Sequence, residues 1–201
     1  MKVVVIDYQL GNIGSVLNML RKIGVEAICS HAADDICEAD KLILPGVGAF
    51  DHGVRNLHEF GLIDVLNHEV LIKKKPILGI CLGMQLLLNE SEEGKLKGLG
   101  WLEGRCVKFS FKNDNEHLKI PHMGWNVVKG YKEGQEEVRF YFVHSYHAQC
   151  KNNTDVLGTA HYGYEFPAII GSNHIIGAQF HPEKSHRYGM EFFKKFLTYD
   201  T

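Results

Sequence analysis

The sequence predicts a single α/β domain with a mostly parallel central sheet, antiparallel additions to that sheet and helices on both faces. In the first half, short apolar segments alternate with segments of helical spacing, as in parallel sheets covered by helices. In the second half, strand-like segments follow one another with short turns between them. The chain has no internal repeat, low-complexity tract or long linker, so we expect residues 1–201 to form one domain.

The first half begins with an apolar, β-branched segment at residues 3–7, followed by a glycine-containing turn and a helix at residues 15–23. A long helical segment at residues 54–74 is expected to break near Gly61. Residues 84–88 are rich in helix formers. The strands expected here are residues 3–7, 25–29, 41–44 and 77–80.

The second half is expected to be mainly β-structure and to end in a helix. Residues 185–197 have the spacing of an amphipathic helix whose buried face comprises Phe192, Phe193, Phe196 and Leu197. The expected strands are residues 107–111, 139–150, 156–161, 168–171 and 175–180.

Composition excludes several classes of function. A net charge of −2 gives no electrostatic basis for binding nucleic acid or an anionic membrane. The 12 histidines show no metal-binding spacing, so we expect neither a metal nor another cofactor. The five cysteines contain no C-x-x-C pair and form a poor disulfide framework, which fits a cytoplasmic protein. No segment approaches the roughly 20 apolar residues of a membrane helix.

Cys81 lies between Gly79 and Gly83, after a strand-like segment and before a helical one. This is the pattern of a nucleophile elbow, in which glycines allow a sharp turn and the helix N-terminus favours thiolate over thiol. A buried, unreactive cysteine explains the pentapeptide equally well.

Two further segments bear on that choice. His181 follows an apolar strand, at the strand end where ligands of open α/β sheets bind, and Glu183 is near enough to orient its imidazole. Residues 44–48 follow another strand of the same sheet, and their glycine-rich turn can direct an N–H toward an oxyanion together with the N–H of Leu82. Taken by itself, this turn fits a simple strand-to-helix connection as well.

Together these motifs resemble the class I glutamine amidotransferase family, which implies a flavodoxin-like fold. The resemblance is closest to the branch formed by the glutaminase subunit of imidazole glycerol phosphate synthase. It covers nearly the whole chain, and the segments that carry it are Asp7-Tyr8 with Gly11-Asn12, residues 44–48 and 79–87, Pro121-His122-Met123-Gly124-Trp125-Asn126, and residues 141–146 and 179–185.

The resemblance implies a role for each matching residue. Cys81 attacks the side-chain amide of L-glutamine to form a glutamyl thioester and release ammonia, with His181 as base and acid and Glu183 as its orienter. Gln85 and Glu93 hold the α-amino and carboxylate ends of glutamine. The backbone of His144, Ser145 and Tyr146 assists them, while Val47, Gly48 and Leu82 form the oxyanion hole.

The resemblance also implies a heterodimer in the histidine pathway, in which a barrel-shaped cyclase covers the active site and receives the ammonia. The matching interface positions are Asn12, Trp125, Tyr141 and Lys184. Without the resemblance, core packing would explain Trp125 and simple solvation would explain Lys184.

The sequence departs from the family in two places, of which the first affects the turn after the first strand and the second leaves the destination of the ammonia open. Gln9 stands where the family has glycine, and residues 186–190 are closer to paralogues that supply ammonia to a sugar amidotransferase in surface-polysaccharide (lipopolysaccharide O-antigen) biosynthesis. The other hypotheses are a stand-alone cysteine hydrolase of γ-glutamyl substrates and an inactive partner-binding module. The latter has no reason to retain Cys81, His181 and Glu183 together.

Overall fold

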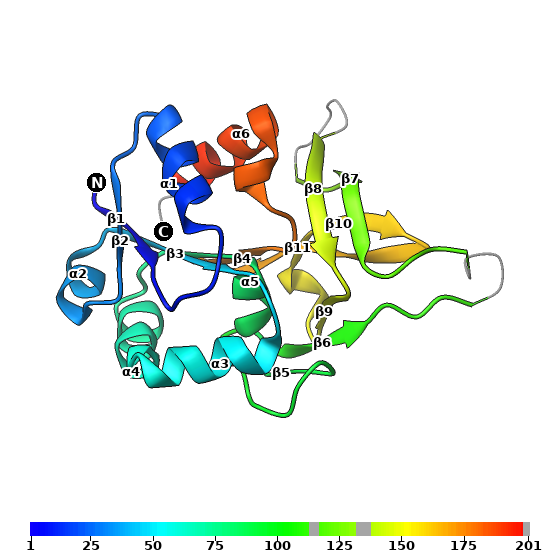
Figure 1. Cartoon of the computed structure of the whole chain (residues 1–201), viewed down its shortest axis with the longest axis horizontal. Coiled ribbons are helices and arrows are strands. Elements are labelled where there is room, and N and C mark those ends of the chain that lie inside the picture. Colours follow the sequence, from blue (N-terminus) through cyan, green and yellow to red (C-terminus); the bar gives the residue numbers. More distant parts are fainter. Residues whose placement is uncertain (113–116, 132–137, 199–201) are drawn as a thin grey trace.

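A seven-stranded central sheet organises the chain, whose residues 1–112, 117–131 and 138–198 are described by a computed structural model. The strand order is β10-β11-β12-β4-β3-β1-β2, and all of these strands except β12 are labelled in Figure 1. The strands are β1 (Val3–Ile6), β2 (Ala27–Ser30), β3 (Lys41–Gly46), β4 (Ile77–Cys81), β10 (Val156–Tyr162), β11 (Tyr164–Ser172) and β12 (Ile175–Ala178).

The pairing confirms the predicted α/β class. Strands β12, β4, β3, β1 and β2 pair in parallel, and β11 and β10 extend the sheet in antiparallel fashion beyond β12. Because β12 pairs directly with β4, the segments that follow these two strands emerge at the same sheet edge.

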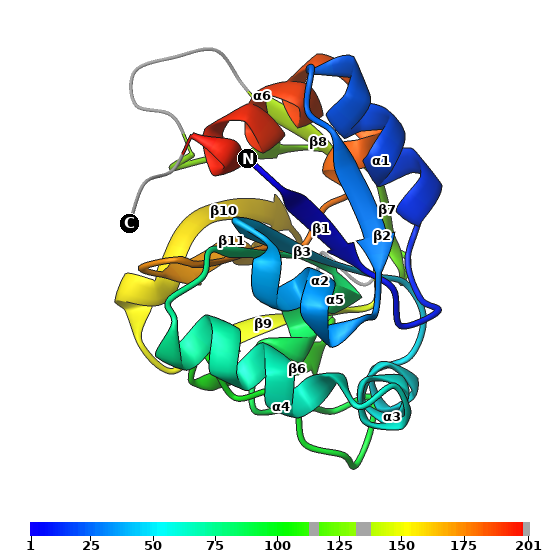
Figure 2. The same cartoon turned by 90° about the vertical axis from the view of Figure 1, so that its left-hand side faces the viewer.

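Helices cover both faces of the sheet (Figure 2). Alternate residues of β1 divide between the two cores, with Val3 and Val5 on one side and Val4 and Ile6 on the other. The first core packs against α1 (Ile13–Lys22) and α6 (His186–Leu197). The second packs against α2 (Ala33–Glu38), α3 (Phe50–Glu59), α4 (Leu62–Asn67), which continues as a π-helical turn at His68–Ile72, and α5 (Leu82–Leu86).

Two small sheets lie beside the central one. One is the three-stranded sheet of β5 (Glu90–Ser91), β6 (Gly104–Lys108) and β9 (Tyr146–Cys150), and the other is the hairpin of β7 (His122–Val128) and β8 (Val138–His144). Short 3₁₀ turns occur at Asn153–Asp155 and Pro182–Lys184, the latter designated η4.

Several predicted elements differ from the structure. Residues 139–150 form two strands in different sheets, because the chain changes partner at Ser145, whose carbonyl accepts a hydrogen bond from the Phe109 N–H. The strand expected at residues 107–111 is β6, which begins earlier and ends at Lys108, after which Phe109 and Phe111 stack on each other. The sequence analysis missed α2, β5 and β7. The expected break near Gly61 is present, and Gly61 adopts φ +65°.

The unusual Gln9 lies in a left-handed turn after β1, with φ +62°, and its N–H donates to Asp7 Oδ1. A glycine has no steric cost in this conformation, whereas a residue with a Cβ atom does. The turn therefore forms with glutamine at a cost in stability.

Candidate active site

Cys81 is the last residue of β4, and α5 begins immediately after it. Its backbone has φ +54° and ψ −109°, a conformation that side chains other than glycine rarely adopt. Tightly packed core strands hold it there, since every residue of β4 is buried. This is the predicted elbow, and the strain lies at the cysteine itself.

The flanking glycines are required by close packing. A Cβ atom at Gly79 would lie 2.7 Å from the Gly83 carbonyl oxygen, and one at Gly83 would lie 1.8 Å from the Leu44 carbonyl oxygen. Neither glycine has a positive φ. The expectation that they supply the turn's conformational freedom was therefore wrong, and they instead allow the first turn of α5 to contact β3 and β4.

A cavity of about 380 Å³ lies beside Cys81, and most of the predicted site residues line it. The sequence analysis did not assign two of its lining residues, Pro121 and Val143. The predicted residues that line it are Val47, Gly48, Cys81, Leu82, Gln85, Glu93, His144, Ser145, Tyr146 and His181.

His181 and Glu183 form a buried pair behind this cavity. His181 Nδ1 is 2.8 Å from Glu183 Oε1, and each side chain is 1% exposed. His181 Nε2 is buried and has no hydrogen-bond partner among the described residues. Burial by itself lowers the pKa of His181, but Cys81 and Glu183 beside it outweigh this effect and hold the pKa well above its usual range.

Backbone hydrogen bonds fix the position of His181. Its N–H donates to the Tyr141 carbonyl at 2.8 Å, and its carbonyl accepts from Ser185 Oγ at 2.7 Å. Ser185 Oγ also accepts from the Tyr141 N–H, and Phe180 stacks on Phe140 with ring centroids 3.8 Å apart. The sequence analysis assigned no role to Ser185, and a lone serine at the start of a helix gives no signal for one.

Two glutamines connect the Cys81 sulfur to the cavity wall. Gln179 Nε2 lies 3.9 Å from Cys81 Sγ, and Gln179 Oε1 accepts from Gln85 Nε2 at 3.1 Å. Gln85 Nε2 also donates to the Tyr146 carbonyl. Gln85, which would be a surface position without the resemblance, is 5% exposed, and Gln179 is fully buried. A polar residue within the apolar segment that follows β12 was the available signal for Gln179.

Glu93 belongs to the cavity and not to a solvated loop. Its Oε2 accepts the Phe50 N–H at 2.8 Å at the beginning of α3. The Asp51 carboxylate accepts the N–H groups of Lys95 and Leu96 and so holds the loop that carries Glu93. The Glu93 carboxylate therefore reaches the cavity in a fixed orientation.

Val47 and Gly48 follow β3, in which Gly46 pairs in parallel with Cys81. Buried Tyr8 supports this turn by donating its hydroxyl to the Pro45 carbonyl at 2.6 Å. A Cβ atom at Gly46 would lie 2.5 Å from that hydroxyl, so the turn requires glycine there. Val47 and Leu82 thus begin the connections after adjacent strand ends.

Trp125, Tyr141 and Lys184 lie together beside the site. Trp125 is 46% exposed and meets Tyr141, its direct partner across β7 and β8, edge to face. Lys184 Nζ lies 5.9 Å from the centre of the Tyr141 ring. Trp125 also stacks on His186. Asn12 directly precedes α1, and its side-chain oxygen accepts a hydrogen bond from the Ser15 hydroxyl.

Within the described part of the chain, no group of three or more histidine, cysteine, aspartate or glutamate residues could hold a metal ion. In the same residues, no helix has the length and apolar composition to cross a lipid bilayer.

The comparisons with known proteins identify the family. A family model described as glutamine amidotransferase class-I matches residues 4–199. The chain belongs to this family. The amidotransferase is therefore a glutaminase, as the resemblance implied.

The similar proteins include three synthase subunits. The chain is 50% identical over 201 residues to the imidazole glycerol phosphate synthase subunit HisH 2 of Methanococcus maripaludis, with 97% of this chain and 98% of that protein covered. It is 49% identical to the subunit HisH 2 of Pseudomonas aeruginosa, with the same coverage. It is 44% identical to the subunit HisH of Bdellovibrio bacteriovorus, with 96% and 97% covered.

Solved structures agree on the fold. A crystal structure described as a glutamine amidotransferase matches with a TM-score of 0.76 at 18% identity and covers 96% of this chain and 97% of that one. The structure of PurLQS from Thermotoga maritima matches with a TM-score of 0.70 at 20% identity and covers 98% of each chain. The predicted amidotransferase fold is confirmed.

Proposed function

We propose that this amidotransferase hydrolyses L-glutamine through a Cys81 thioester and supplies the ammonia to an imidazole glycerol phosphate synthase partner in histidine biosynthesis. The observation that carries the proposal is the buried His181–Glu183 pair, whose histidine lines the same cavity as Cys81, the residue directly before a helix. The synthase-subunit names of relatives about 50% identical support the pathway.

In the first step, the Cys81 thiolate attacks the side-chain carbonyl carbon of glutamine. N–H groups of Val47, Gly48 and Leu82 stabilise the developing oxyanion, since these residues line the cavity beside the sulfur. The protonated His181 gives its proton to the leaving nitrogen, which departs as ammonia and leaves the glutamyl thioester. Glu183 favours this protonated form of His181 because its carboxylate accepts the Nδ1 hydrogen.

In the second step, neutral His181 removes a proton from water, which attacks the thioester and releases glutamate and the Cys81 thiolate. The amino-acid end of glutamine is held elsewhere in the cavity. The Glu93 carboxylate pairs with the α-ammonium group, and Gln85 uses its free Oε1, since its amide nitrogen is bound to Gln179 and Tyr146. The backbone of residues 144–146 completes this subsite.

The partner is proposed to dock over Asn12, Trp125, Tyr141 and Lys184. An exposed tryptophan, a tyrosine and a lysine gathered on one face are typical of protein interfaces. The Tyr141 carbonyl holds the His181 N–H, so a partner that contacts Tyr141 is one residue away from the buried catalytic histidine. Ammonia released from Cys81 can then pass to the partner without entering bulk water.

The experiment is ammonia release from glutamine by the purified chain, alone and with each candidate partner, with Cys81→Ala as the control. Activation by an imidazole glycerol phosphate cyclase and its ribonucleotide ligand is the expected result. Activation by a sugar-modifying synthetase instead would replace the histidine pathway with surface-polysaccharide biosynthesis. Rates equal to those of Cys81→Ala with every partner would contradict the proposal.

A further inference from the structure

A series of hydrogen bonds that does not include Cys81, His181 or Glu183 ends at the wall of the proposed glutamine cavity. Asn126 Nδ2 is 3.2 Å from His122 Nε2, and His122 Nδ1 is 3.0 Å from His144 Nε2. His144 Nδ1 is 2.8 Å from the carbonyl oxygen of Tyr146. The mechanism above uses neither imidazole ring. We refer to Asn126, His122 and His144 as the histidine row.

The direction of every hydrogen bond in the histidine row follows from its two ends, which are both carbonyl groups. A carbonyl only accepts, so His144 Nδ1 must carry a hydrogen for Tyr146. At the other end, Asn126 Nδ2 donates to the His161 carbonyl at 2.8 Å, which fixes the orientation of that amide. The second Nδ2 hydrogen then points to His122 Nε2. His122 therefore accepts at Nε2 and donates from Nδ1 to His144.

This arrangement requires both rings to be neutral. Burial lowers the pKa of His122 to about 4, and burial together with nearby histidines lowers the pKa of His144 to about 3. A proton added to either ring would place two N–H groups face to face. The hydrogen bonds of the histidine row therefore all have a fixed direction, and each N–H hydrogen in it has one acceptor.

The histidine row runs from the inner face of β7 to the glutamine subsite. Met123 and Trp125 on the outer face are 64% and 46% exposed, whereas His122 is 3% exposed. His122 and His144 are direct partners across β7 and β8. At the far end, the Tyr146 carbonyl also accepts from Gln85, a proposed glutamine-binding residue.

We propose that His122 and Asn126 are positioning residues that hold the 144–146 wall of the glutamine cavity in register with the partner-facing strand β7. The inference rests on the proposed function, because it assigns the wall to glutamine and β7 to the partner. Tyr146 begins β9 directly after the change of sheet at Ser145 and pairs with Lys108 of β6, while its carbonyl accepts from two side-chain donors. The hydrogen bond from His144, together with the one from Gln85, orients this carbonyl.

The alternative is that His122 acts only as packing. Its ring stacks on Tyr162 with centroids 4.2 Å apart and lies 4.9 Å from the Phe142 ring. A phenylalanine at this position would keep such contacts but has no donor for His144. An asparagine loses ring contacts but retains an N–H near the position of Nδ1. If the hydrogen bond to His144 matters, His122→Phe should impair glutamine binding more than His122→Asn does. If His122 acts only as packing, His122→Asn should be the more harmful substitution.

The test compares His122→Phe with His122→Asn by the rate at which each variant's Cys81 is labelled. The probes are a glutamine-shaped electrophile, 6-diazo-5-oxo-L-norleucine, and iodoacetamide, which needs no amino-acid subsite. We expect His122→Phe to slow labelling by the glutamine analogue about tenfold, as for one lost buried hydrogen bond, with iodoacetamide labelling unchanged. His122→Asn should recover most of that loss. A smaller loss in His122→Phe than in His122→Asn would overturn the proposal.

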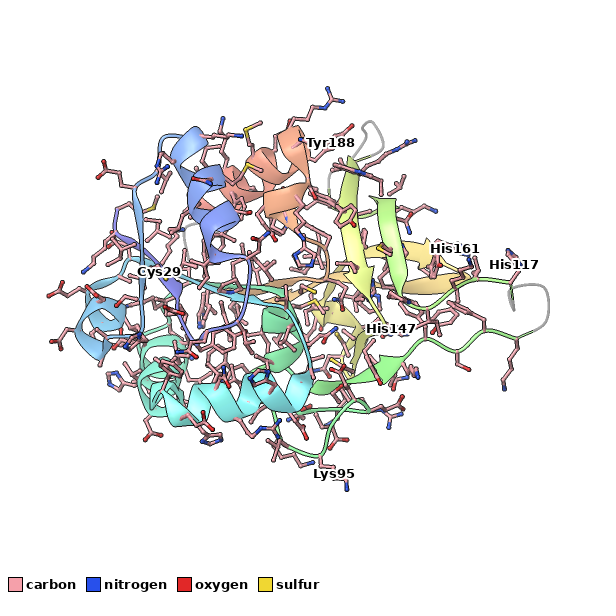
Figure 3. All side chains as sticks on the ribbon, in the orientation of Figure 1. Cys29, Lys95, His117, His147, His161 and Tyr188 are labelled. Atoms are coloured by element: carbon pink, nitrogen blue, oxygen red, sulfur yellow. The ribbon has the colours of Figure 1, made fainter. Side chains whose placement is uncertain are left out.

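His147 provides a matched control, because its ring contacts Phe109, as the rings of His122 and His144 do, but its hydrogen bonds lie outside the histidine row. Figure 3 labels His147 and also His161, whose carbonyl anchors the far end of the histidine row. His147→Phe should leave the ratio of the two labelling rates unchanged, and a change equal to that of His122→Phe would overturn the proposal.

Nitrogen-15 NMR of the unchanged protein provides an independent test. His122 and His144 should both carry their hydrogen on Nδ1, and an Nε2-protonated His122 would overturn the histidine row whatever the labelling rates. If glutamine fails to protect Cys81 of the unchanged protein from the analogue, the proposed function fails, and the assignment of the row to that site fails with it.

Discussion

Replacement of Glu183 by glutamine should weaken catalysis and shift its pH dependence. The hydrogen bond from His181 Nδ1 is 2.8 Å long and joins two side chains that are each 1% exposed. A charge-assisted bond contributes about 1.5–3 kcal/mol, against about 1 kcal/mol for a neutral one. Glu183→Gln should therefore remove ~1.5 kcal/mol from the stabilisation of protonated His181. This is roughly a tenfold loss in rate and about one pH unit in the pKa of His181.

The direction of the pH effect follows from the proposed chemistry. Protonated His181 gives its proton to the leaving ammonia, so activity is lost as the pH rises through the raised pKa of His181. A lower pKa in Glu183→Gln moves this alkaline limit to lower pH by about one unit. The assay is glutaminase kcat/KM across pH for the complex with its partner.

Glu69→Gln is the matched control. Glu69 is also a buried glutamate with a charged partner, Lys75, at 2.7 Å, but it lies in the π-helical turn and outside the cavity. This variant should be less stable than the wild-type protein but should lose glutaminase activity at the same alkaline pH. A Glu183→Gln variant with an unshifted alkaline limit would refute the assignment of Glu183 as the group that stabilises protonated His181.

Three further outcomes are expected. Iodoacetamide should modify Cys81 faster than the other four cysteines, measured by mass spectrometry of the labelled peptides. Burial raises the pKa of each of those four, namely Cys106, Cys150, Cys37 and Cys29, the last of which lies on the edge strand β2 (Figure 3). Equal labelling of Cys29 would count against the elbow. Gln9→Gly should stabilise the chain by ~1 kcal/mol and raise Tm by roughly 2–4 °C in a thermal scan, because φ is +62° there, whereas an unchanged Tm would mean that the turn is unstrained. Lys184→Ala should weaken partner binding, measured by calorimetry, and leave the iodoacetamide rate of Cys81 intact, and loss of that rate would place Lys184 within the catalytic site.

The location of the candidate site was predictable from the sequence because its main residues lie at or just after strand ends. Cys81 and His181 come after two apolar segments that pair as neighbours in the sheet, so their proximity follows from topology. The elbow was also predictable, although its glycines serve packing and not conformational freedom.

Other features depend on tertiary contacts that leave no local pattern. Gln179 bonds to Cys81 and Gln85, which lie 98 and 94 positions earlier, and Ser185 accepts from the Tyr141 N–H, 44 positions earlier. The division of residues 139–150 between two sheets was missed because strand-like composition continues across Ser145, and the N–H that binds its carbonyl comes from Phe109. The short helix α2 lacks a side-chain cap, which removes the usual signal for a helix start.

At Cys81, the proposed reaction and the stability of the fold favour different residues. With φ +54° and ψ −109°, this position suits glycine better than any residue that bears a nucleophile. A chain with glycine there would lose the proposed nucleophile, yet it should be harder to unfold than the protein with cysteine. The backbone at the proposed nucleophile is therefore strained in the folded protein, and the surrounding buried strands must be stable enough to offset that strain.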